Sequence, residues 1–161
     1  EAPAMVFDDQ NEVVETFKRG EMDQDVIVVL RFQGPKANGM PELHKVTSPL
    51  GVLQDRGYKV ALITDGRMSG ASGKVPSAIH LSPECLDDSN LTKVQNGDMI
   101  YLNTQTGELT LKVDEDELAK RKPAEFRRTE QHYGTGRELF TTFRAAVSTA
   151  ETGAVSMFND G

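Results

Sequence analysis

The chain has 161 residues, 37% of them apolar, and a formal net charge of −7 at pH 7. This acidic balance argues against general nucleic-acid binding, and no stretch reaches the roughly 18 apolar residues that a membrane helix needs. The single cysteine, Cys85, excludes an internal disulfide and favours a reducing compartment. We therefore expect one cytoplasmic domain over residues 1–161, with neither a nucleic-acid nor a membrane partner.

The first part of the chain predicts a helix and two buried strands. Residues 9–20 ("DQNEVVETFKRG") favour a short helix, because Asp9 can cap its start and Gly20 can end it. Two runs rich in β-branched residues follow, "DVIVVLRF" at 25–32 and "YKVALIT" at 58–64. Such continuous apolar runs are typical of strands that are covered on both faces.

Further elements are predicted between and after these strands. Residues 42–57 favour one or two short helical pieces that are interrupted at Pro49. A third short strand is expected at 77–82, and the alternating pattern of 97–113 predicts a β-hairpin. The apolar spacing near the end predicts an amphipathic helix over about 135–151.

The order of these elements does not alternate strand with helix, which favours an α+β fold. We expect a mixed, largely β sheet that curls into an open barrel with flanking helices, a swivelling β/β/α-type domain with its core at 26–113. Both buried strands lead into glycine-rich loops, "GPKANGMPE" at 34–42 and "TDGRMSGASG" at 64–73. Loops that leave strand ends often carry function, so we expect a site there.

The second loop fails each of the common motifs that it suggests. A P-loop is excluded because Met68 lies five residues before Gly73-Lys74, where that motif requires glycine. A Rossmann fingerprint lacks its third glycine, and a nucleophile elbow fails because Gly70 directly follows Ser69. Two interpretations of Ser69 stay open: it satisfies the backbone of the turn, or it acts as a base in a strong positive field.

Charged residues in and beside the two loops suit an anionic ligand or a metal ion. Arg67 and Lys74 bring positive charge to the second loop of a net-acidic chain, which favours a small carboxylate or phosphate. His44 and Lys45 follow the first loop and either bind the same anion or are solvated. Glu42 offers the hard carboxylate oxygen that Mg²⁺ prefers, or is a first-turn acid at a helix start.

Three stretches together resemble a known family: "VVLRFQGPKANGMPELHK", "GYKVALITDGRMSGASGKVPSAIHLSPE" and "NGDMIYLNTQTGELTL". They resemble the C-terminal domain of the dihydroxy-acid dehydratase and 6-phosphogluconate dehydratase family. The resemblance runs from about Val26 to Val113 and resumes in "TGRELFTTFRAAVSTAETGA". The run "ANGMPELH" and the tail "GRELFTTFR" are most similar to the branch that acts on 6-phosphogluconate.

This resemblance implies a hydro-lyase that dehydrates 6-phospho-D-gluconate to 2-dehydro-3-deoxy-6-phosphogluconate, in the Entner–Doudoroff pathway. Family members are several hundred residues long, and their N-terminal domain supplies the cysteines of an iron–sulfur cluster and most Mg²⁺ ligands. The chain would then complete an active site with its own N-terminal domain, in a full-length enzyme expected to be a homodimer. We expect the isolated domain to be inactive and to expose an apolar face.

For single residues, the resemblance implies that Ser69 is the base that takes the C2 proton and that Glu42 is a Mg²⁺ ligand. The cluster iron would act as a Lewis acid on the departing 3-hydroxyl. The candidates for binding the carboxylate or phosphate of the substrate are Arg67, Lys74, His44 and Lys45. Two rival functions stay open: a dehydratase of the same family for dihydroxy-acids or sugar acids, and a non-catalytic anion-binding module.

Overall fold

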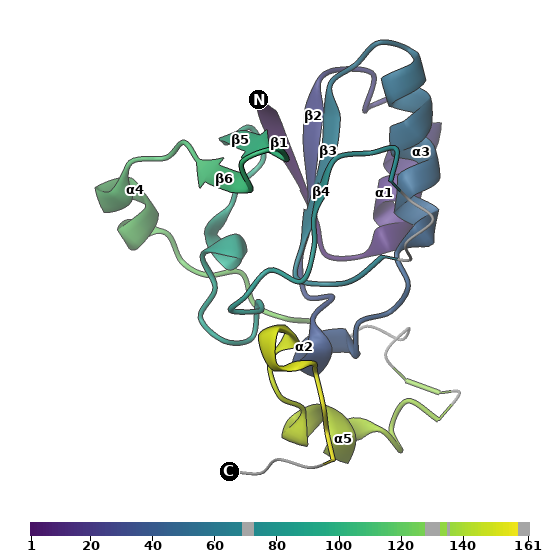
Figure 1. Cartoon of the computed structure of the whole chain (residues 1–161), viewed down its shortest axis with the longest axis vertical. Helices are drawn as coiled ribbons and strands as arrows, with labels where there is room; N and C mark the ends of the chain where they lie inside the picture. The colour runs from purple at the N-terminus through teal and green to yellow at the C-terminus, as the bar shows by residue number, and fades with distance from the viewer. Residues whose placement is uncertain (69–72, 128–132, 135, 158–161) are drawn as a thin grey trace.

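The described residues form one mixed sheet of six strands. The computed structural model describes residues 1–68, 73–127, 133–134 and 136–157. The strands have the spatial order β4-β3-β2-β1-β5-β6 (Figure 1). Their bounds are β1 Ala2–Phe7, β2 Val26–Leu30, β3 Val60–Thr64, β4 Ser77–Ala78, β5 Met99–Asn103 and β6 Glu108–Leu111. The first four strands pair in parallel, and β5 pairs antiparallel with β1 and with β6.

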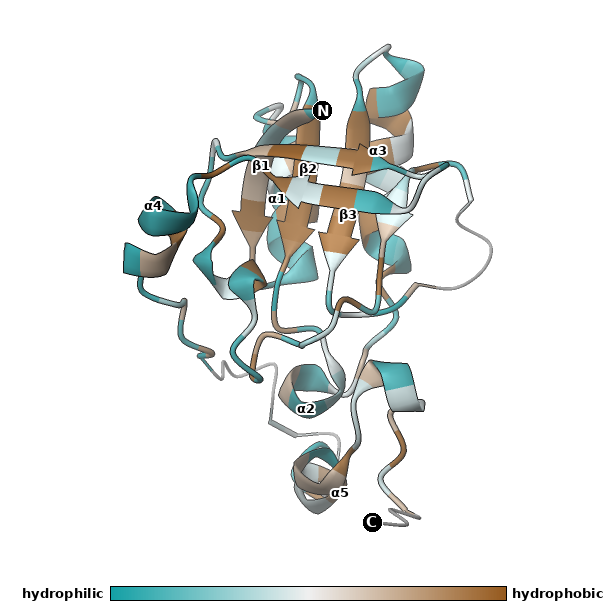
Figure 2. Ribbon diagram, turned by 60° about the vertical axis from the view of Figure 1, so that its left-hand side comes forward, coloured by the Kyte–Doolittle hydropathy of each residue, from teal (hydrophilic) through white to brown (hydrophobic). Residues whose placement is uncertain are grey.

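The sheet curls so that its antiparallel end lies across its parallel part. Figure 2 shows the hairpin of β5 and β6 crossing β1, β2 and β3, and the sheet is nearly closed into a barrel. Apolar side chains fill its inside, among them Ile27, Val29, Ile63 and Ile100. Cys85 belongs to the same buried cluster and packs there as a small apolar residue. The predicted mixed fold, with a curled sheet and flanking helices, is confirmed.

Two helices, α1 (Gln10–Lys18) and α3 (His44–Asp55), lie side by side on the outer face of the parallel strands (Figure 1). Asp9 caps α1, since its carboxylate accepts a hydrogen bond from the N–H of Asn11 at 2.8 Å. Alternate side chains of β2, such as Val28 and Leu30, pack against the buried stripes of both helices. Every residue of β2 and β3 is buried, so both predicted strands are confirmed as doubly covered.

The helix α3 continues through Pro49, so the predicted interruption at this residue is wrong. A proline removes one backbone N–H from the hydrogen-bonding ladder of a helix. Its neighbours Val46, Leu50 and Leu53 are fully buried in the core between α3 and the sheet. Burial of this stripe stabilises the helix on both sides of the proline, which offsets the missing hydrogen bond.

The strand β1 was not predicted, although it lies near the middle of the sheet. Its residues Ala2, Pro3 and Ala4 are weak strand formers, so the sequence pattern gives no clear signal. Pairing supplies the missing stability, because β1 bonds to β2 along one edge and to β5 along the other. The core therefore begins well before residue 26.

The last part of the chain is less regular than the sequence suggests. In place of a helix over 135–151, the described residues form the short helix α5 (Thr141–Ala146) and a 3₁₀ turn, η3 (Ala150–Thr152). Leu139 and Phe140 are exposed, so this segment lacks the burial that stabilises an amphipathic helix. The remaining short helices are α2 (Pro35–Asn38), η1 (Asn90–Lys93) and α4 (Glu115–Lys120).

Two other predicted elements have different outcomes. The hairpin predicted at 97–113 is confirmed by β5 and β6, whereas the strand predicted at 77–82 is limited to the two residues of β4. Within the described part of the chain, the helices lack the combination of length and apolar character needed to cross a bilayer.

Candidate functional site

The loops that follow the parallel strands gather around α2, at the carboxyl ends of β1, β2 and β3 (Figures 1 and 2). Asp65, directly after β3, is fully buried and ties these loops together. Its Oδ1 accepts a hydrogen bond from the N–H of Gln33 at 2.8 Å, and its Oδ2 accepts one from the N–H of Cys85 at 3.0 Å. Asp65 therefore fixes three loops at the ends of the strands.

Two glycines allow these loops to approach one another closely. A Cβ at Gly66 would lie 2.6 Å from Cβ of Gln33, and a Cβ at Gly34 would lie 2.5 Å from Oε2 of Glu84. Glu84 accepts hydrogen bonds from the N–H groups of Lys36 and Ala37. Burial raises the pKa of Glu84 above its usual value, although these two N–H groups act to lower it. Both glycines are thus required by packing.

Arg67 clamps the two glycine-rich loops together. Its Nη1 donates to Oε2 of Glu42 at 2.9 Å, and its Nε donates to the carbonyl oxygen of Met40 at 2.8 Å. The backbones of Glu42 and Arg67 also form an isolated parallel β-bridge. Both side chains keep part of their surface in contact with solvent, at 45% for Arg67 and 35% for Glu42. Two of the predicted site residues are therefore adjacent and accessible.

His44 and Lys45 begin α3, directly after this clamp, and both side chains are exposed. Lys74 lies elsewhere: its ammonium pairs with Asp55 at 2.5 Å, at the last residue of α3. At 1.5 Å per residue, the two ends of this helix are about 16 Å apart. Substrate binding by Lys74 stays a prediction that this position does not favour. Ser69 lies outside the described residues.

The described residues do not form a complete metal site. No group of three His, Cys, Asp or Glu side chains among them is placed to hold a metal ion. Glu42 fits the role of one oxygen ligand, because its carboxylate is accessible beside Arg67. The buried thiol of Cys85 is unsuited to bind a cluster, since burial and then the charge of Asp65 raise its pKa far above the usual value.

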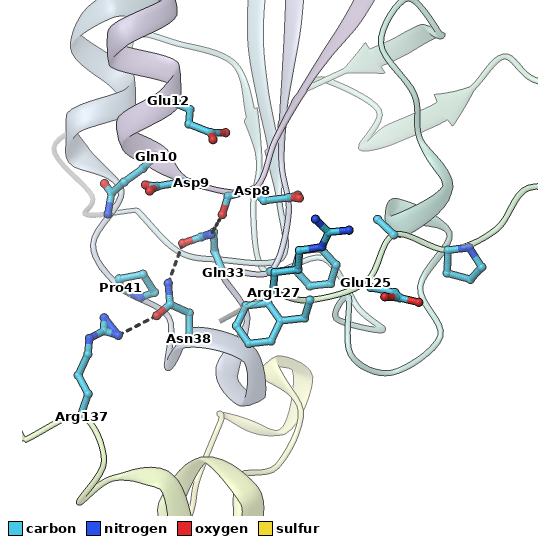
Figure 3. Close-up of a pocket in the computed structure, with 14 residues that line it drawn as sticks. Asp8, Asp9, Gln10, Glu12, Gln33, Asn38, Pro41, Glu125, Arg127 and Arg137 are labelled. Atoms are coloured by element: carbon cyan, nitrogen blue, oxygen red, sulfur yellow. Dashed lines mark hydrogen bonds between the residues drawn. The ribbon is translucent and has the colours of Figure 1, made fainter. Parts of the chain in front are cut away.

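A first cavity, of about 650 Å³, lies beside the ends of β1 and β2 (Figure 3). Among the described residues of its lining, the acidic ones are Asp8, Asp9, Glu12 and Glu125, and the basic ones are Arg127 and Arg137. The carboxylates outnumber the guanidinium groups, so the balance of charge disfavours an anionic ligand.

A second cavity, of about 480 Å³, lies between α2, α5 and the Arg67 loop. Arg67, Arg137 and Arg144 all line it, and no acidic side chain is among the described residues of its lining. Phe140 and Phe143 provide an apolar wall, with their ring centroids 5.9 Å apart. This is a positively charged cavity in a chain whose net charge is −7.

Sequence reasoning assigned no role to Arg137 and Arg144. Both belong to "GRELFTTFR", which contributed to the family resemblance but not to the set of site residues. They lie 70 and 77 positions after Arg67, so a local sequence pattern cannot predict that the three arginines form a cluster. The available signal was the presence of two arginines in an amphipathic segment, because burial of its apolar side chains would bring both to the same surface.

Comparisons with known proteins identify the family of the chain. The model of a family described as "Dihydroxy-acid/6-phosphogluconate dehydratase C-terminal" matches residues 1–154. The phosphogluconate dehydratase of Escherichia coli (strain K12) is 60% identical over 154 residues, which are 96% of this chain and 26% of that protein. The phosphogluconate dehydratase of Zymomonas mobilis is 55% identical over 158 residues, 98% of this chain and 26% of that protein.

A more distant relative, the dihydroxy-acid dehydratase of Methanococcoides burtonii, is 37% identical over 155 residues. These residues are 95% of this chain and 27% of that relative. The chain thus spans about a quarter of the length of the curated relatives that it matches.

Proposed function

The chain belongs to the dihydroxy-acid/6-phosphogluconate dehydratase family, as its C-terminal domain, and from this we propose that it forms one side of the active site of a 6-phosphogluconate dehydratase. One observation carries the proposal: Arg67 holds Glu42 against its own loop at 2.9 Å. The two loops to which the resemblance assigns a metal ligand and a base are thereby joined at the strand ends. Identity of 60% to one phosphogluconate dehydratase supports this substrate.

The proposed reaction removes a proton from C2 and the hydroxyl from C3 of 6-phospho-D-gluconate. The enol product then tautomerises to 2-dehydro-3-deoxy-6-phosphogluconate. A proton beside a carboxylate is only weakly acidic, so the negative charge that develops there must be stabilised. When bound, an iron–sulfur cluster and Mg²⁺ would supply the positive charge that stabilises the developing anion and the leaving hydroxide, and Glu42 would be one of the residues that hold Mg²⁺.

The residues of this chain have separate roles in the proposal. Ser69 is the base, and its ionised oxygen takes the C2 proton while the electron pair of the C–H bond forms the new double bond. Glu42 provides one oxygen ligand to Mg²⁺, and its ion pair with Arg67 holds this carboxylate in a fixed direction. Arg67, His44 and Lys45 are the proposed ligands of the anionic end of the substrate, since Arg67 pairs with Glu42 and the other two residues begin α3 just after it.

The rest of the active site is proposed to come from the longer protein. Most of the large apolar side chains that are exposed among the described residues lie in the segment 133–157, including Phe140, Phe143 and Met157. Such a concentration is typical of a surface that packs against another domain. We expect this face to meet the N-terminal domain, and the isolated chain to be inactive. The homodimer and the cytoplasmic location stay predictions.

Substrate profiling of the full-length enzyme tests the proposed function. With its metal cofactors loaded under anaerobic conditions, the enzyme is offered 6-phosphogluconate, gluconate and a branched dihydroxy-acid, and 2-oxo acid formation is measured. We expect the highest kcat/KM for 6-phosphogluconate. A higher value for either of the other two acids would assign the chain to another branch of the family.

A separate titration tests the non-catalytic alternative. In this experiment 6-phosphogluconate is added to the isolated chain, and binding is measured by calorimetry. The proposal predicts weak binding, because the other half of the site is missing. Binding as tight as that of the full-length enzyme would favour a stand-alone anion-binding module.

A further inference from the structure

We propose that Arg137 and Arg144 bind the phosphate group of the substrate, in the second cavity, which they share with Arg67. This inference rests on the proposed function, because it names the part of the substrate that the C-terminal segment recognises. The ligand chemistry is that of a phosphate monoester: a dianion with three oxygen atoms, for which guanidinium groups are well suited.

The charge of the cavity supports an anionic ligand. Three arginines and no carboxylate are among its described lining residues, whereas the described lining of the first cavity has four carboxylates and two arginines. Three guanidinium groups that line one cavity favour a ligand of opposite charge, although one of them, Arg67, is also paired with Glu42. A phosphate dianion offers more charge to be neutralised than a single carboxylate does.

Neighbouring groups orient both arginines. The Nη1 of Arg137 donates to Oδ1 of Asn38 at 2.9 Å, and Asn38 in turn donates to the side chain of Gln33 at 3.1 Å (Figure 3). The Nη1 of Arg144 donates to the carbonyl oxygen of Arg137 at 3.1 Å, and its Nη2 donates to Oγ1 of Thr141 at 3.2 Å. Side chains held in this way lose less entropy when a ligand binds.

The stem of Arg144 also lies against α2. A Cβ added at Gly39, the residue that ends α2, would be 3.9 Å from Cδ of Arg144. The φ angle of Gly39 is +71°, in the left-handed region that favours glycine. The first glycine-rich loop therefore forms part of the cavity wall and connects Arg144 to the Glu42 side of the site.

The order of the charged groups matches the order of groups in the substrate. The reacting carbons C2 and C3 adjoin the carboxylate, so this end belongs near Glu42 and Arg67. The phosphate lies on C6, at the other end of the carbon chain. Arg67 contacts Glu42 and also lines the second cavity, so a molecule that extends from Glu42 past Arg67 reaches Arg137 and Arg144.

Kinetics of the full-length enzyme with two substrates test this assignment. The variants Arg137→Ala and Arg144→Ala should each raise KM for 6-phosphogluconate by about ten- to a hundredfold, with kcat/KM for gluconate unchanged. The inhibition constant of inorganic phosphate, used as a competitor, should rise by a similar factor. Arg56→Ala is the matched control, because Arg56 is exposed and pairs with Asp23 near the last residue of α3; it should change neither constant.

The outcomes separate this inference from the proposed function. Equal losses on both substrates, or unchanged KM for 6-phosphogluconate, would overturn the phosphate assignment while leaving the function intact. If the wild-type enzyme does not dehydrate 6-phosphogluconate, the proposed function fails by itself. Binding of inorganic phosphate, followed by phosphorus NMR, then decides the inference, with loss in the alanine variants supporting it. Should an alanine variant not fold, Arg137→Lys and Arg144→Lys replace it, with a smaller but still phosphate-specific loss expected.

Discussion

Arg67 donates to the carboxylate of Glu42 at 2.9 Å and to the carbonyl oxygen of Met40 at 2.8 Å. One side chain thus joins the loop after β3 to the loop between α2 and α3. The first of these loops contains the proposed base and the second contains the proposed metal ligand. This guanidinium group and the β-bridge between the backbones of Glu42 and Arg67 together hold the two loops in place.

Arg67→Ala should lower kcat/KM of the full-length enzyme for 6-phosphogluconate by about tenfold or more, because two hydrogen bonds from a charged group are lost. The free energy of unfolding of the chain should change by less than about 1 kcal/mol, because the ion pair is partly exposed. Steady-state kinetics and urea unfolding measure the two effects. Lys74→Ala is the control, and it should leave kcat/KM within about twofold. A larger loss from Lys74→Ala than from Arg67→Ala would contradict the assigned positions.

Gly66→Ala should destabilise the chain by about 1–3 kcal/mol. The added Cβ would meet Cβ of Gln33 at 2.6 Å, which is bonded to the backbone and cannot turn away, and Cδ1 of the fully buried Leu43 at 3.0 Å. The matched control is Gly73→Ala in the same loop, where no atom lies within 4 Å of the added Cβ. Urea unfolding of both variants measures the difference. Equal stability of the two would show that the loops are not packed as described.

Asp65→Asn should destabilise the chain by about 1–3 kcal/mol. Asparagine keeps one acceptor oxygen, but its amide turns a donor toward the N–H of either Gln33 or Cys85. Since Asp65 is fully buried, water cannot satisfy the N–H group that loses its partner. Thermal unfolding and the amide chemical shifts of the two loops report the change. Unaltered stability would mean that Asp65 does not hold these loops.

The doubly covered strands were predictable because their signal is local. Continuous apolar runs rich in β-branched residues, such as 26–30 and 60–64, are typical of strands that are buried on both faces. The strand β1 was not predictable, since its alanines gain their strand conformation from partners that lie 23 and more than 90 positions away. The C-terminal helix was overpredicted, because an apolar pattern indicates a helix only where a partner surface buries it.

The part of the candidate site that lies in the two glycine-rich loops was predictable from the sequence, whereas the contribution of the C-terminal segment was not. The motifs that contain Glu42 and Arg67 pointed to neighbouring loops, and the structure joins these two residues by an ion pair. Lys74 pairs with Asp55, the last residue of α3, whereas Arg67 pairs with Glu42 just before its first residue. The two cations of this loop therefore contact opposite ends of the helix. Arg137 and Arg144 line the same cavity as Arg67 because the C-terminal segment folds back against α2. Local sequence spacing does not predict such a long-range contact.

Acid should remove the stabilisation that Asp98 provides. Burial acts to raise the pKa of this carboxyl, but the paired hydrogen bonds from Arg121 and the N–H of Gln95 outweigh burial and lower it below 3.8. An acid with a lowered pKa in the folded state stabilises the protein above its usual pKa, and this contribution is lost as the pH falls through the folded-state pKa.

Asp98→Asn should therefore reduce the urea midpoint at neutral pH, and the gap to the wild type should narrow as the pH falls below 3.8. Urea unfolding of both proteins across this range measures the gap. Asp114→Asn, at the exposed N-cap of α4, is the control, because the Asp114 carboxylate accepts hydrogen bonds from the backbone N–H groups of Asp116 and Glu117. A gap that stays constant down to the lowest pH would refute the role given to the Asp98–Arg121 pair.

The most direct test of the proposed active-site role of this chain is Ser69→Ala in the full-length, cofactor-loaded enzyme. Ser48→Ala, on the exposed side of α3, is its control. We predict that kcat for 6-phosphogluconate falls by about 10²- to 10⁴-fold, while cluster content and substrate binding match the wild type. Turnover close to that of the wild type, with an intact cluster, would contradict the assignment of the base.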